Sequence, residues 1–321
     1  MILGADLIGF SFRKIASLLE KGFRSTGYRD VKILNMWNPL SYARDYKIIL
    51  LGDTILMTKA GFLERARVMA DKIVFWGDTP LSLEHLDAKK LDDACVYVTL
   101  PHQIKLYAEH GVKVFGYIPR PIDVDTAVQV RNEDCRDLHS KYGEYIITVG
   151  SDQIIYPPKI PRKGLDMYDL LCERLKDVRC IAVSNWRFKN VISIKSGSLP
   201  EKDLLKLIKC SKLFVWTSRA EGFGMPPVEA MAVGTPVVSS DAPFNEHIVG
   251  VKFSYDTIEK VFMPELNMYY YAYDYSPLAL REAVVYALSM SDDERSEIVS
   301  QGIELAKYYH PMRISIWLGD I

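Results

Sequence analysis

The chain has 321 residues, about twice the length of a typical domain, and its length therefore predicts two domains. With 49% hydrophobic and 25% charged residues, the composition excludes a disordered chain, a collagen-like fibre and a disulfide-stabilised miniprotein. The 40 basic and 41 acidic residues leave a net charge of −1. This balance excludes attraction to nucleic acid through overall charge and leaves only a local basic patch open, so no nucleic-acid partner is expected.

The cysteines and the N-terminus predict a cellular location. An odd set of cysteines without CxxC or CxxxC spacing argues against a disulfide framework or a structural zinc site, and it predicts a reducing cytoplasm. The five cysteines are Cys95, Cys135, Cys172, Cys180 and Cys210. The apolar N-terminus contains Asp6 and no basic stretch before it, so no signal peptide is expected. No stretch reaches the roughly 18–20 uncharged apolar residues that a membrane-spanning helix needs.

The first third alternates short apolar runs with amphipathic stretches, which predicts βαβ units around a parallel sheet. The predicted strands are 31–36, 46–51, 72–76, 95–99 and 112–117. The predicted helices are 12–24, 56–70 and 102–110. Two prolines then impose an extended backbone on residues 118–123 (IPRPID), and the charged stretch 123–140 is predicted to connect two domains.

A second alternating series follows this connection. The predicted strands are 145–149, 179–184, 213–217 and 235–239. The predicted helices are 166–175, 200–208, 227–233, 278–288 and 292–308. The two series predict Rossmann-like domains at residues 1–123 and 124–321, with the last helix able to pack back on the first domain. Ligands of such sheets bind beyond the carboxyl ends of the strands, so the site is expected in the cleft between the domains.

Residues 218–240 (SRAEGFGMPPVEAMAVGTPVVSS) carry the chemical signal. Gly222 and Gly224 permit positive φ and a close approach of the backbone to a ligand. Two prolines suit the first turn of the following helix, and Gly234 suits its end. The free N–H groups at the start of this helix favour an anion such as a diphosphate.

Two carboxylates, Glu221 and Glu229, bracket this loop with seven residues between them. Each is able to accept hydrogen bonds from the hydroxyl groups of a sugar or a ribose. In the alternative interpretation, the segment is only a tight helix–strand turn in which Glu229 complements the helix dipole.

The stretch EGFGMPPVEAMAVGTPVV resembles the E-x7-E signature of retaining GT-B glycosyltransferases, and specifically of glycosyltransferase family 4 (glycosyl transferases group 1). Three other segments resemble the family in the required order. They are IPRPID before the hinge, ITVG followed by RKG after it, and the closing helices over residues 281–317. The resemblance implies a GT-B fold with two Rossmann-like domains facing each other across a cleft and with C-terminal helices that close the chain.

The resemblance also implies a reaction, in which a sugar passes from a nucleotide-diphosphate sugar to an acceptor hydroxyl with retained configuration. Glu229 would then hold the ribose, Glu221 the donor sugar and Lys163 the diphosphate. The backbone that lines the sugar and phosphates would come from Gly222, Phe223, Gly224 and Met225. A lysine and a helix N-terminus stabilise charge on a leaving diphosphate. The sequence shows no histidine-rich cluster, so no metal or other cofactor is expected.

This sequence departs from the family pattern at two places. Ser151 stands where the family usually has an arginine, and an apparent insertion over residues 152–161 follows, so Arg162 or Arg120 is expected to supply the second cation. The strand that carries a histidine in many members ends here in Asp78, so Asp78 or His102 is expected near the reacting sugar. The alternatives are a turn or N-cap role for Asp78 and an ordinary helix-start role for His102.

The acceptor is expected to bind the first domain, and the resemblance implies a glycan, lipid-linked or protein-linked hydroxyl. Residues 12–24 predict a basic amphipathic helix, which is able to lie on the inner membrane surface or to pack on the sheet. The tyrosine-rich residues 267–275 are either a sugar-stacking surface or a strand. Two other functions stay open: a sugar-nucleotide 2-epimerase of the same fold, and a non-catalytic scaffold that binds nucleotide sugars.

Overall fold

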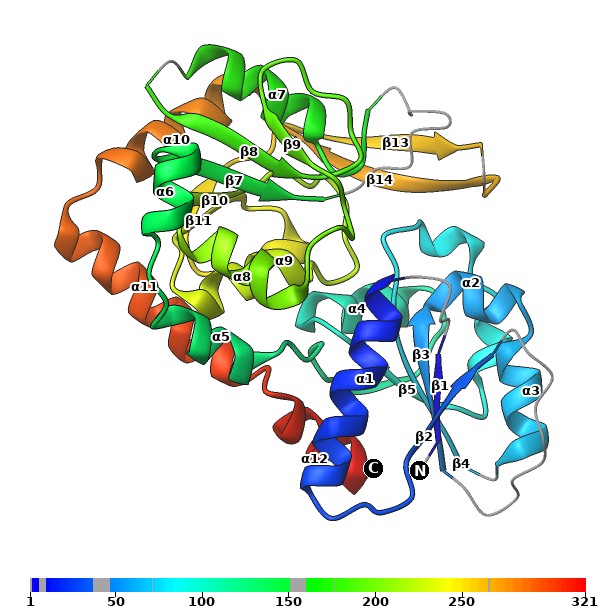
Figure 1. Ribbon diagram of the computed structural model, residues 1–321. Coiled ribbons are helices and arrows are strands. Elements are labelled where there is room, and N and C mark those ends of the chain that lie inside the picture. The colour runs from blue at the N-terminus through cyan, green and yellow to red at the C-terminus, as the bar shows by residue number, and fades with distance from the viewer. Residues whose placement is uncertain are drawn as a thin grey trace. The chain divides into compact units, whose positions relative to one another are not determined.

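The computed structural model describes residues 2–5, 10–36, 47–70, 72–150, 160–175, 177–264 and 266–321 (Figure 1). The chain divides into two compact units, one formed by residues 1–123 and 309–321 and the other by residues 124–308. Each unit contains one six-stranded parallel sheet. The predicted fold class, two Rossmann-like α/β domains with closing helices, is confirmed.

The sheet of the first unit has the strand order β2-β1-β3-β4-β5-β6. Its strands are β1 (Ile2–Ala5), β2 (Lys32–Asn35), β3 (Lys47–Asp53), β4 (Lys72–Asp78), β5 (Cys95–Val98) and β6 (Val114–Tyr117). The short strand β1 was not expected from the sequence, yet it pairs with both β2 and β3. The chain therefore reverses its direction of winding between β1 and β3, the point where ligands bind in open α/β sheets.

The helices of the first unit are α1 (Phe10–Ser25), α2 (Thr54–Lys59), α3 (Phe62–Met69), α4 (Pro101–Glu109) and α12 (Pro311–Asp320). Helix α1 runs beside α12 (Figure 1). The two helices are so close that a methyl group on Gly22 would lie 2.5 Å from the Pro311 carbonyl oxygen. The apolar face of α1, including Ile15, Leu19 and Phe23, is buried in this packing. Of the two interpretations of residues 12–24, the structure favours packing within the unit, because the unit itself covers the apolar face.

Two predicted elements of the first half differ in the structure. The helix expected over residues 56–70 is two helices, because Gly61 takes a left-handed φ of 73° between α2 and α3. The stretch 123–140 is not a bare connection but forms α5 (Val124–Arg131) and α6 (Arg136–Tyr142). Helix α5 buries Val124, Ala127 and Val130, a short apolar stripe that the surrounding charges obscured in the sequence.

The sheet of the second unit has the order β12-β11-β10-β7-β8-β9. Its strands are β7 (Tyr145–Val149), β8 (Arg179–Val183), β9 (Ile192–Ile194), β10 (Leu213–Trp216), β11 (Val237–Ser240) and β12 (Val251–Phe253). The winding reverses between β7 and β10, so the loops that follow these two strands meet at one edge. Strands β9 and β12 have three residues each and escaped prediction because so short a run gives no clear periodicity.

The remaining helices of this unit are α7 (Leu165–Arg174), α8 (Glu201–Lys209), α9 (Met225–Val233), α10 (Pro277–Ser289) and α11 (Asp292–Lys307). An antiparallel hairpin of β13 (Thr257–Met263) and β14 (Met268–Asp274) projects from the unit (Figure 1). The tyrosine-rich run is therefore a strand. Met268, Tyr270 and Ala272 are buried on one face of β14, whereas Tyr269 and Tyr271 are exposed on the other.

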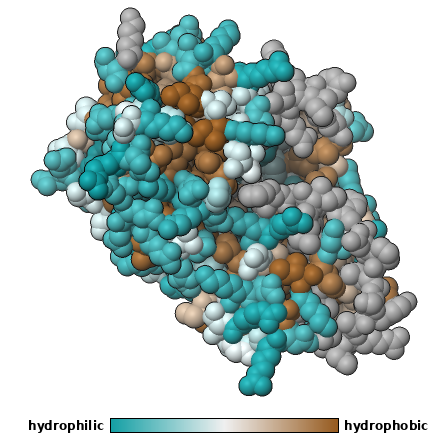
Figure 2. Space-filling view, viewed as in Figure 1, coloured by the Kyte–Doolittle hydropathy of each residue, from teal (hydrophilic) through white to brown (hydrophobic). Residues whose placement is uncertain are grey.

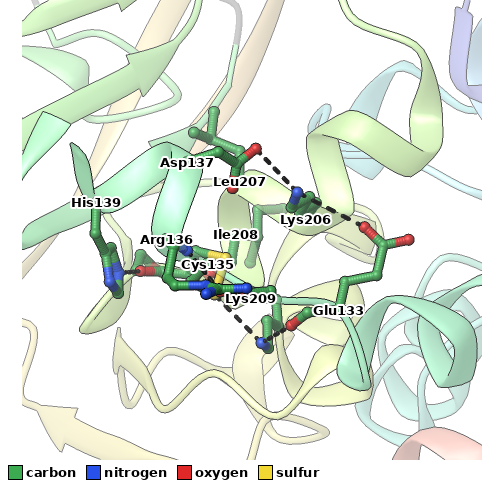
Figure 3. Close-up of a disulfide and its surroundings, with 12 residues drawn as sticks. Glu133, Cys135, Arg136, Asp137, His139, Lys206, Leu207, Ile208 and Lys209 are labelled. Carbon is green, nitrogen blue, oxygen red and sulfur yellow. Dashed lines mark hydrogen bonds and ion pairs between the residues drawn. A yellow bond between two sulfur atoms is a disulfide. The ribbon is translucent and has the colours of Figure 1, made fainter. Parts of the chain in front are cut away.

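Two disulfides overturn the expectation that the cysteines stay unpaired. Cys135 at the start of α6 bonds Cys210 at the end of α8, and Cys172 bonds Cys180. Figure 3 shows the first disulfide among charged side chains, where Lys206 Nζ lies 3.0 Å from a carboxylate oxygen of Asp137. Cys135 and Cys210 are 75 residues apart, and nothing in that spacing reveals that two helix ends meet in the fold.

Alkylation tests the two disulfides directly. We expect a thiol reagent, added to the denatured but unreduced protein, to label Cys95 alone, because Cys95 is the free cysteine. After reduction, the reagent should label all five cysteines, and peptide mass spectrometry identifies the sites. Labelling of Cys135 or Cys172 before reduction would contradict the pairing.

Among the described residues, no helix combines the length and the apolar character that crossing a lipid bilayer requires. Apart from the grey residues, hydrophilic residues cover most of the face shown in Figure 2, and hydrophobic residues form patches between them.

Candidate functional site

The loop between β10 and α9 contains the predicted glycine bend. Gly224 ends the loop with a φ of 82°, and α9 follows with two prolines in its first turn. Gly234 ends the helix with a φ of 83°, as expected. Gly222 does not have positive φ, so only the second glycine of the bend requires the left-handed conformation. The start of α9 thus lies at the carboxyl edge of the sheet, where its N–H groups favour an anion.

Lys163 lies at the same edge, in the segment that leads from β7 to α7. Thr217 Oγ1 donates a hydrogen bond to the Lys163 carbonyl oxygen over 2.9 Å, which fixes this segment to the end of β10. The Lys163 ammonium lies 5.3 Å from the centre of the Trp216 ring. The predicted insertion that begins after Ser151 falls largely at residues 151–159, which lie outside the described residues.

Gly164 permits this close approach, because its φ is 62° and a methyl group in its place would lie 1.9 Å from the Thr217 carbonyl oxygen. We expect Gly164→Ala to lower the free energy of unfolding by about 2–3 kcal/mol, from left-handed strain and overpacking together. Gly197 is the matched control, since its φ is 76° and nothing lies within 4 Å of a methyl group there. Gly197→Ala should cost only about 1 kcal/mol in a denaturant titration. Equal losses in the two variants would contradict the close approach.

Glu221 is the centre of a charged cluster. Its side chain keeps 8% of its surface exposed, and Lys163 Nζ donates to its Oε1. Arg162 Nη1 lies 3.5 Å from Oε2, and Ser218 Oγ donates to Oε1 over 2.6 Å. Burial favours the neutral acid, but the charges of Lys163 and Arg162 and these hydrogen bonds outweigh it and hold the Glu221 pKa below its usual range. The site therefore presents an ionised carboxylate beside two cations.

Arg219 organises the segments around this cluster, and sequence analysis did not identify it. Its guanidinium donates to both carboxylate oxygens of Asp166, at 2.7 and 3.0 Å, and to Asp274 at 2.6 Å. It also donates to the Pro161 carbonyl oxygen, and its own carbonyl accepts from the Tyr273 N–H. Arg219 thus joins the Lys163 segment, the Glu221 loop and the β13–β14 hairpin. An arginine beside a glycine loop gives no sequence signal for this role, because its partners lie more than 50 residues away.

Glu229 and Phe223 flank the cluster from α9 and the loop. Helix α9 begins at Met225, two residues earlier than predicted, so Glu229 lies in the second turn of the helix and not in the first. It is 6% exposed. Phe223 is buried and stacks on the His247 ring, with the ring centres 4.6 Å apart. The backbone from Gly222 to Met225 leads from Glu221 into α9, and its role in lining a ligand stays a prediction.

Asp78 and Arg120 form a separate buried pair in the first unit. Asp78 ends β4, and its Oδ2 accepts from Arg120 Nε at 3.3 Å and from Thr99 Oγ1 at 3.2 Å. Arg120 is 1% exposed. The structure therefore brings Asp78 and Arg120, two of the predicted site residues, together in the first unit. It brings three others, Lys163, Arg162 and Glu221, together in the second unit. Of Arg162 and Arg120, the two candidates for the second cation, Arg162 is the one that contacts Glu221.

His102 is the second residue of α4 and is partly exposed. Its neighbour Gln103 makes the structural contacts of this helix start, because Gln103 Oε1 accepts from the N–H groups of Thr99 and Leu100. The structure thus favours the helix-start interpretation of His102. Within the described part of the chain, no three His, Cys, Asp or Glu side chains gather as a metal ion would require.

The comparison with solved structures defines the class of fold. The crystal structure of Anabaena Alr3699/HepE in complex with UDP-glucose is similar with a TM-score of 0.66 and 13% identity, over 100% of this chain and 99% of that chain. Trehalose-6-phosphate synthase OtsA is similar with a TM-score of 0.62 and 12% identity, over 96% of this chain and 75% of that chain. With its two parallel Rossmann-like sheets and closing helices, the chain has the GT-B fold.

The model of the family "Glycosyl transferases group 1" matches residues 190–254, which include the glycine bend and both glutamates. Over this segment the chain is similar to the family, so the predicted resemblance is confirmed. "Putative glycosyltransferase 48" of Sulfolobus islandicus filamentous virus is 29% identical over 189 residues, which are 58% of this chain and 57% of that protein. "Putative glycosyltransferase ORF378" of Acidianus filamentous virus 2 is 54% identical over 48 residues, 15% of this chain and 13% of that protein. The chain thus spans about half, or less, of the length of these relatives.

Proposed function

We propose that this protein is a retaining glycosyltransferase that moves a sugar from a nucleotide-diphosphate sugar to an acceptor hydroxyl. The observation that carries the proposal is the cluster of Glu221, Lys163 and Arg162 beside the start of α9, at the edge where the winding of the sheet reverses. The family match supports the reaction class. The UDP-glucose in the crystal structure of HepE supports a uridine nucleotide as the first donor to test.

In the proposed reaction, the bond between the anomeric carbon and the donor phosphate breaks, and a bond from the acceptor oxygen to that carbon forms on the same face. The proton of the acceptor hydroxyl passes to the departing phosphate oxygen. Negative charge grows on the diphosphate during this step, and Lys163 together with the N–H groups of α9 stabilises it. Glu221 orients the donor sugar and Lys163, and Glu229 holds the ribose. These positive groups supply the charge stabilisation, so we propose transfer without a metal ion.

The acceptor in this proposal is a hydroxyl of a glycan or of a lipid-linked or protein-linked sugar. We propose the cytoplasm as the place of reaction. The two disulfides are compatible with it, because intracellular proteins of heat-adapted microbes often contain disulfides. The low number of Asn and Gln residues points to the same kind of source.

Release of nucleotide diphosphate tests the proposal. The protein is incubated with UDP-, GDP- and ADP-sugars in the presence of EDTA and a mixture of sugar acceptors. We expect release from one class of donor, retained configuration in the product and loss of release in Glu221→Ala. Free 2-epimer in the product would instead indicate an epimerase. Tight donor binding without release in any acceptor mixture would indicate a scaffold.

A further inference from the structure

Arg120 has hydrogen-bond donors that the described part of the chain does not use. The side chain is 1% exposed, and its Nε donates to Asp78. Its two other nitrogen atoms, Nη1 and Nη2, are buried and have no hydrogen-bond partner among the described residues. Burial of charged donors without partners carries a large desolvation penalty. A ligand with acceptor oxygen atoms would remove this penalty.

Two aromatic rings hold this guanidinium in place. Its central carbon lies 4.6 Å from the centre of the Trp76 ring and 5.4 Å from that of the Phe12 ring. The hydrogen bond from Nε to Asp78 fixes its orientation as well. A planar guanidinium held in this way presents Nη1 and Nη2 as a rigid fork, which matches the paired oxygen atoms of a carboxylate or a phosphate.

The start of α1 lies beside the same guanidinium. Phe12 belongs to the first turn of this 16-residue helix, and that turn contains no acidic residue. The first N–H groups of a helix have no acceptor within it, and the helix dipole favours an anion there. The basic residues Arg13 and Lys14 follow directly. Helix α1 leaves β1 at the reversal between β1 and β3, which is the expected ligand position in this sheet.

We propose that the first unit contains a binding site for an oxyanion, a phosphate monoester or a carboxylate, between the fork of Arg120 and the first turn of α1. Asp78 holds the arginine from its other edge. Asp53, the nearby carboxylate at the end of β3, accepts from the Ile55 and Leu56 N–H groups and from Thr79, so its oxygen atoms are engaged elsewhere. The site lies wholly in the first unit and shares no residue with the Glu221 cluster.

The proposed function indicates which molecule carries the anionic group. If the protein is a transferase with its donor site in the second unit, an anion in the first unit belongs to the acceptor, which is then a phosphorylated or carboxylated sugar. This assignment rests on the proposed function, whereas the existence of the oxyanion site does not.

Binding of inorganic phosphate tests the site without any transfer reaction. Calorimetric titration of the full chain, against sodium chloride of equal ionic strength as reference, should show a phosphate site in the wild-type protein that is retained in Lys163→Met and is therefore separate from any phosphate binding at the start of α9. Arg120→Lys keeps the charge but loses the fork, and we expect it to weaken phosphate binding by roughly tenfold or more. Arg295→Lys is the matched control, because Arg295 lies in the second unit and donates to the Lys212 and Ala287 carbonyl oxygens. It should bind phosphate as the wild type does.

A second measurement needs no variant, in case Arg120→Lys does not fold. Phosphate should slow hydrogen exchange in the first turn of α1 in the wild-type protein.

Titrations with a hexose 6-phosphate, a hexuronate and the unmodified hexose then identify the anion. The unmodified hexose should bind more weakly than at least one of the two anionic sugars. Absence of a phosphate site in the wild type, or equal binding in Arg120→Lys, would overturn the proposal and leave a buried water as the partner of Arg120. Donor hydrolysis, measured separately, reports on the second unit and thus on the proposed function alone.

Discussion

Replacing Lys163 with methionine should lower the rate of sugar transfer by roughly 10²–10³-fold, the usual loss when one preorganised group that stabilises a developing charge is removed. Methionine keeps the apolar stem that lies near Gly150 and the Trp216 ring but has no ammonium group. The negative charge on the departing diphosphate then meets only Arg162 and the N–H groups of α9. We expect the loss in kcat, because this interaction strengthens as the diphosphate leaves.

Removal of Lys163 also leaves Glu221 with less positive charge around it. Burial then raises the Glu221 pKa, since desolvation favours the neutral acid. The double variant Lys163→Met/Glu221→Gln removes this unbalanced carboxylate, so it should recover thermal stability without recovering transfer. Lys202→Met on the exposed side of α8 is the matched control and should retain the wild-type rate. Recovery of transfer in the double variant, or an unchanged rate in Lys163→Met, would contradict the role of Lys163.

The cluster around Glu221 could be predicted because most of its residues lie within one short segment. The spacing of Glu221, Gly224 and Glu229 is local, and a strand followed by a glycine bend and a helix is a unit that local sequence determines. Lys163 was found because it lies in a second short motif, whose glycine at 164 fits against the end of β10. The structure adds the contact between Lys163 and Glu221, which joins residues 58 positions apart.

What the sequence did not reveal depends on pairing between distant residues. The partners of Arg219 are the side chains of Asp166 and Asp274, and an arginine among other charges looks like a surface residue in the sequence. Arg120 was noticed only as a possible second cation, because its burial between two rings depends on the packing of α1 against the sheet. Strand β1 was missed because its four residues are too few to show a period, although the order of the sheet depends on it.

Replacing Arg219 with methionine should lower the free energy of unfolding by about 3–4 kcal/mol, near the lower end of the range for removal of one partner of a buried ion pair. The Arg219 side chain is 4% exposed, whereas Asp166 and Asp274 keep about a third of their surface in water and recover part of their hydration. Burial by itself favours the neutral arginine, but the hydrogen bond and charge of Asp166 hold the Arg219 pKa above its usual range. The charged form is therefore the one that the fold stabilises.

Denaturant titrations of four variants measure this effect. Arg219→Met should lose the most stability, and the triple variant Arg219→Met/Asp166→Asn/Asp274→Asn should regain part of it, because no uncompensated carboxylate remains. Arg295→Met is the matched control and should lose less than about 1 kcal/mol, since its guanidinium bonds carbonyl oxygens near the surface. Because Arg219 joins the Lys163 segment to the Glu221 loop, Arg219→Lys should restore most of the stability but only part of the transfer rate. Full recovery of both by lysine would show that Arg219 supplies charge alone and does not position the cluster.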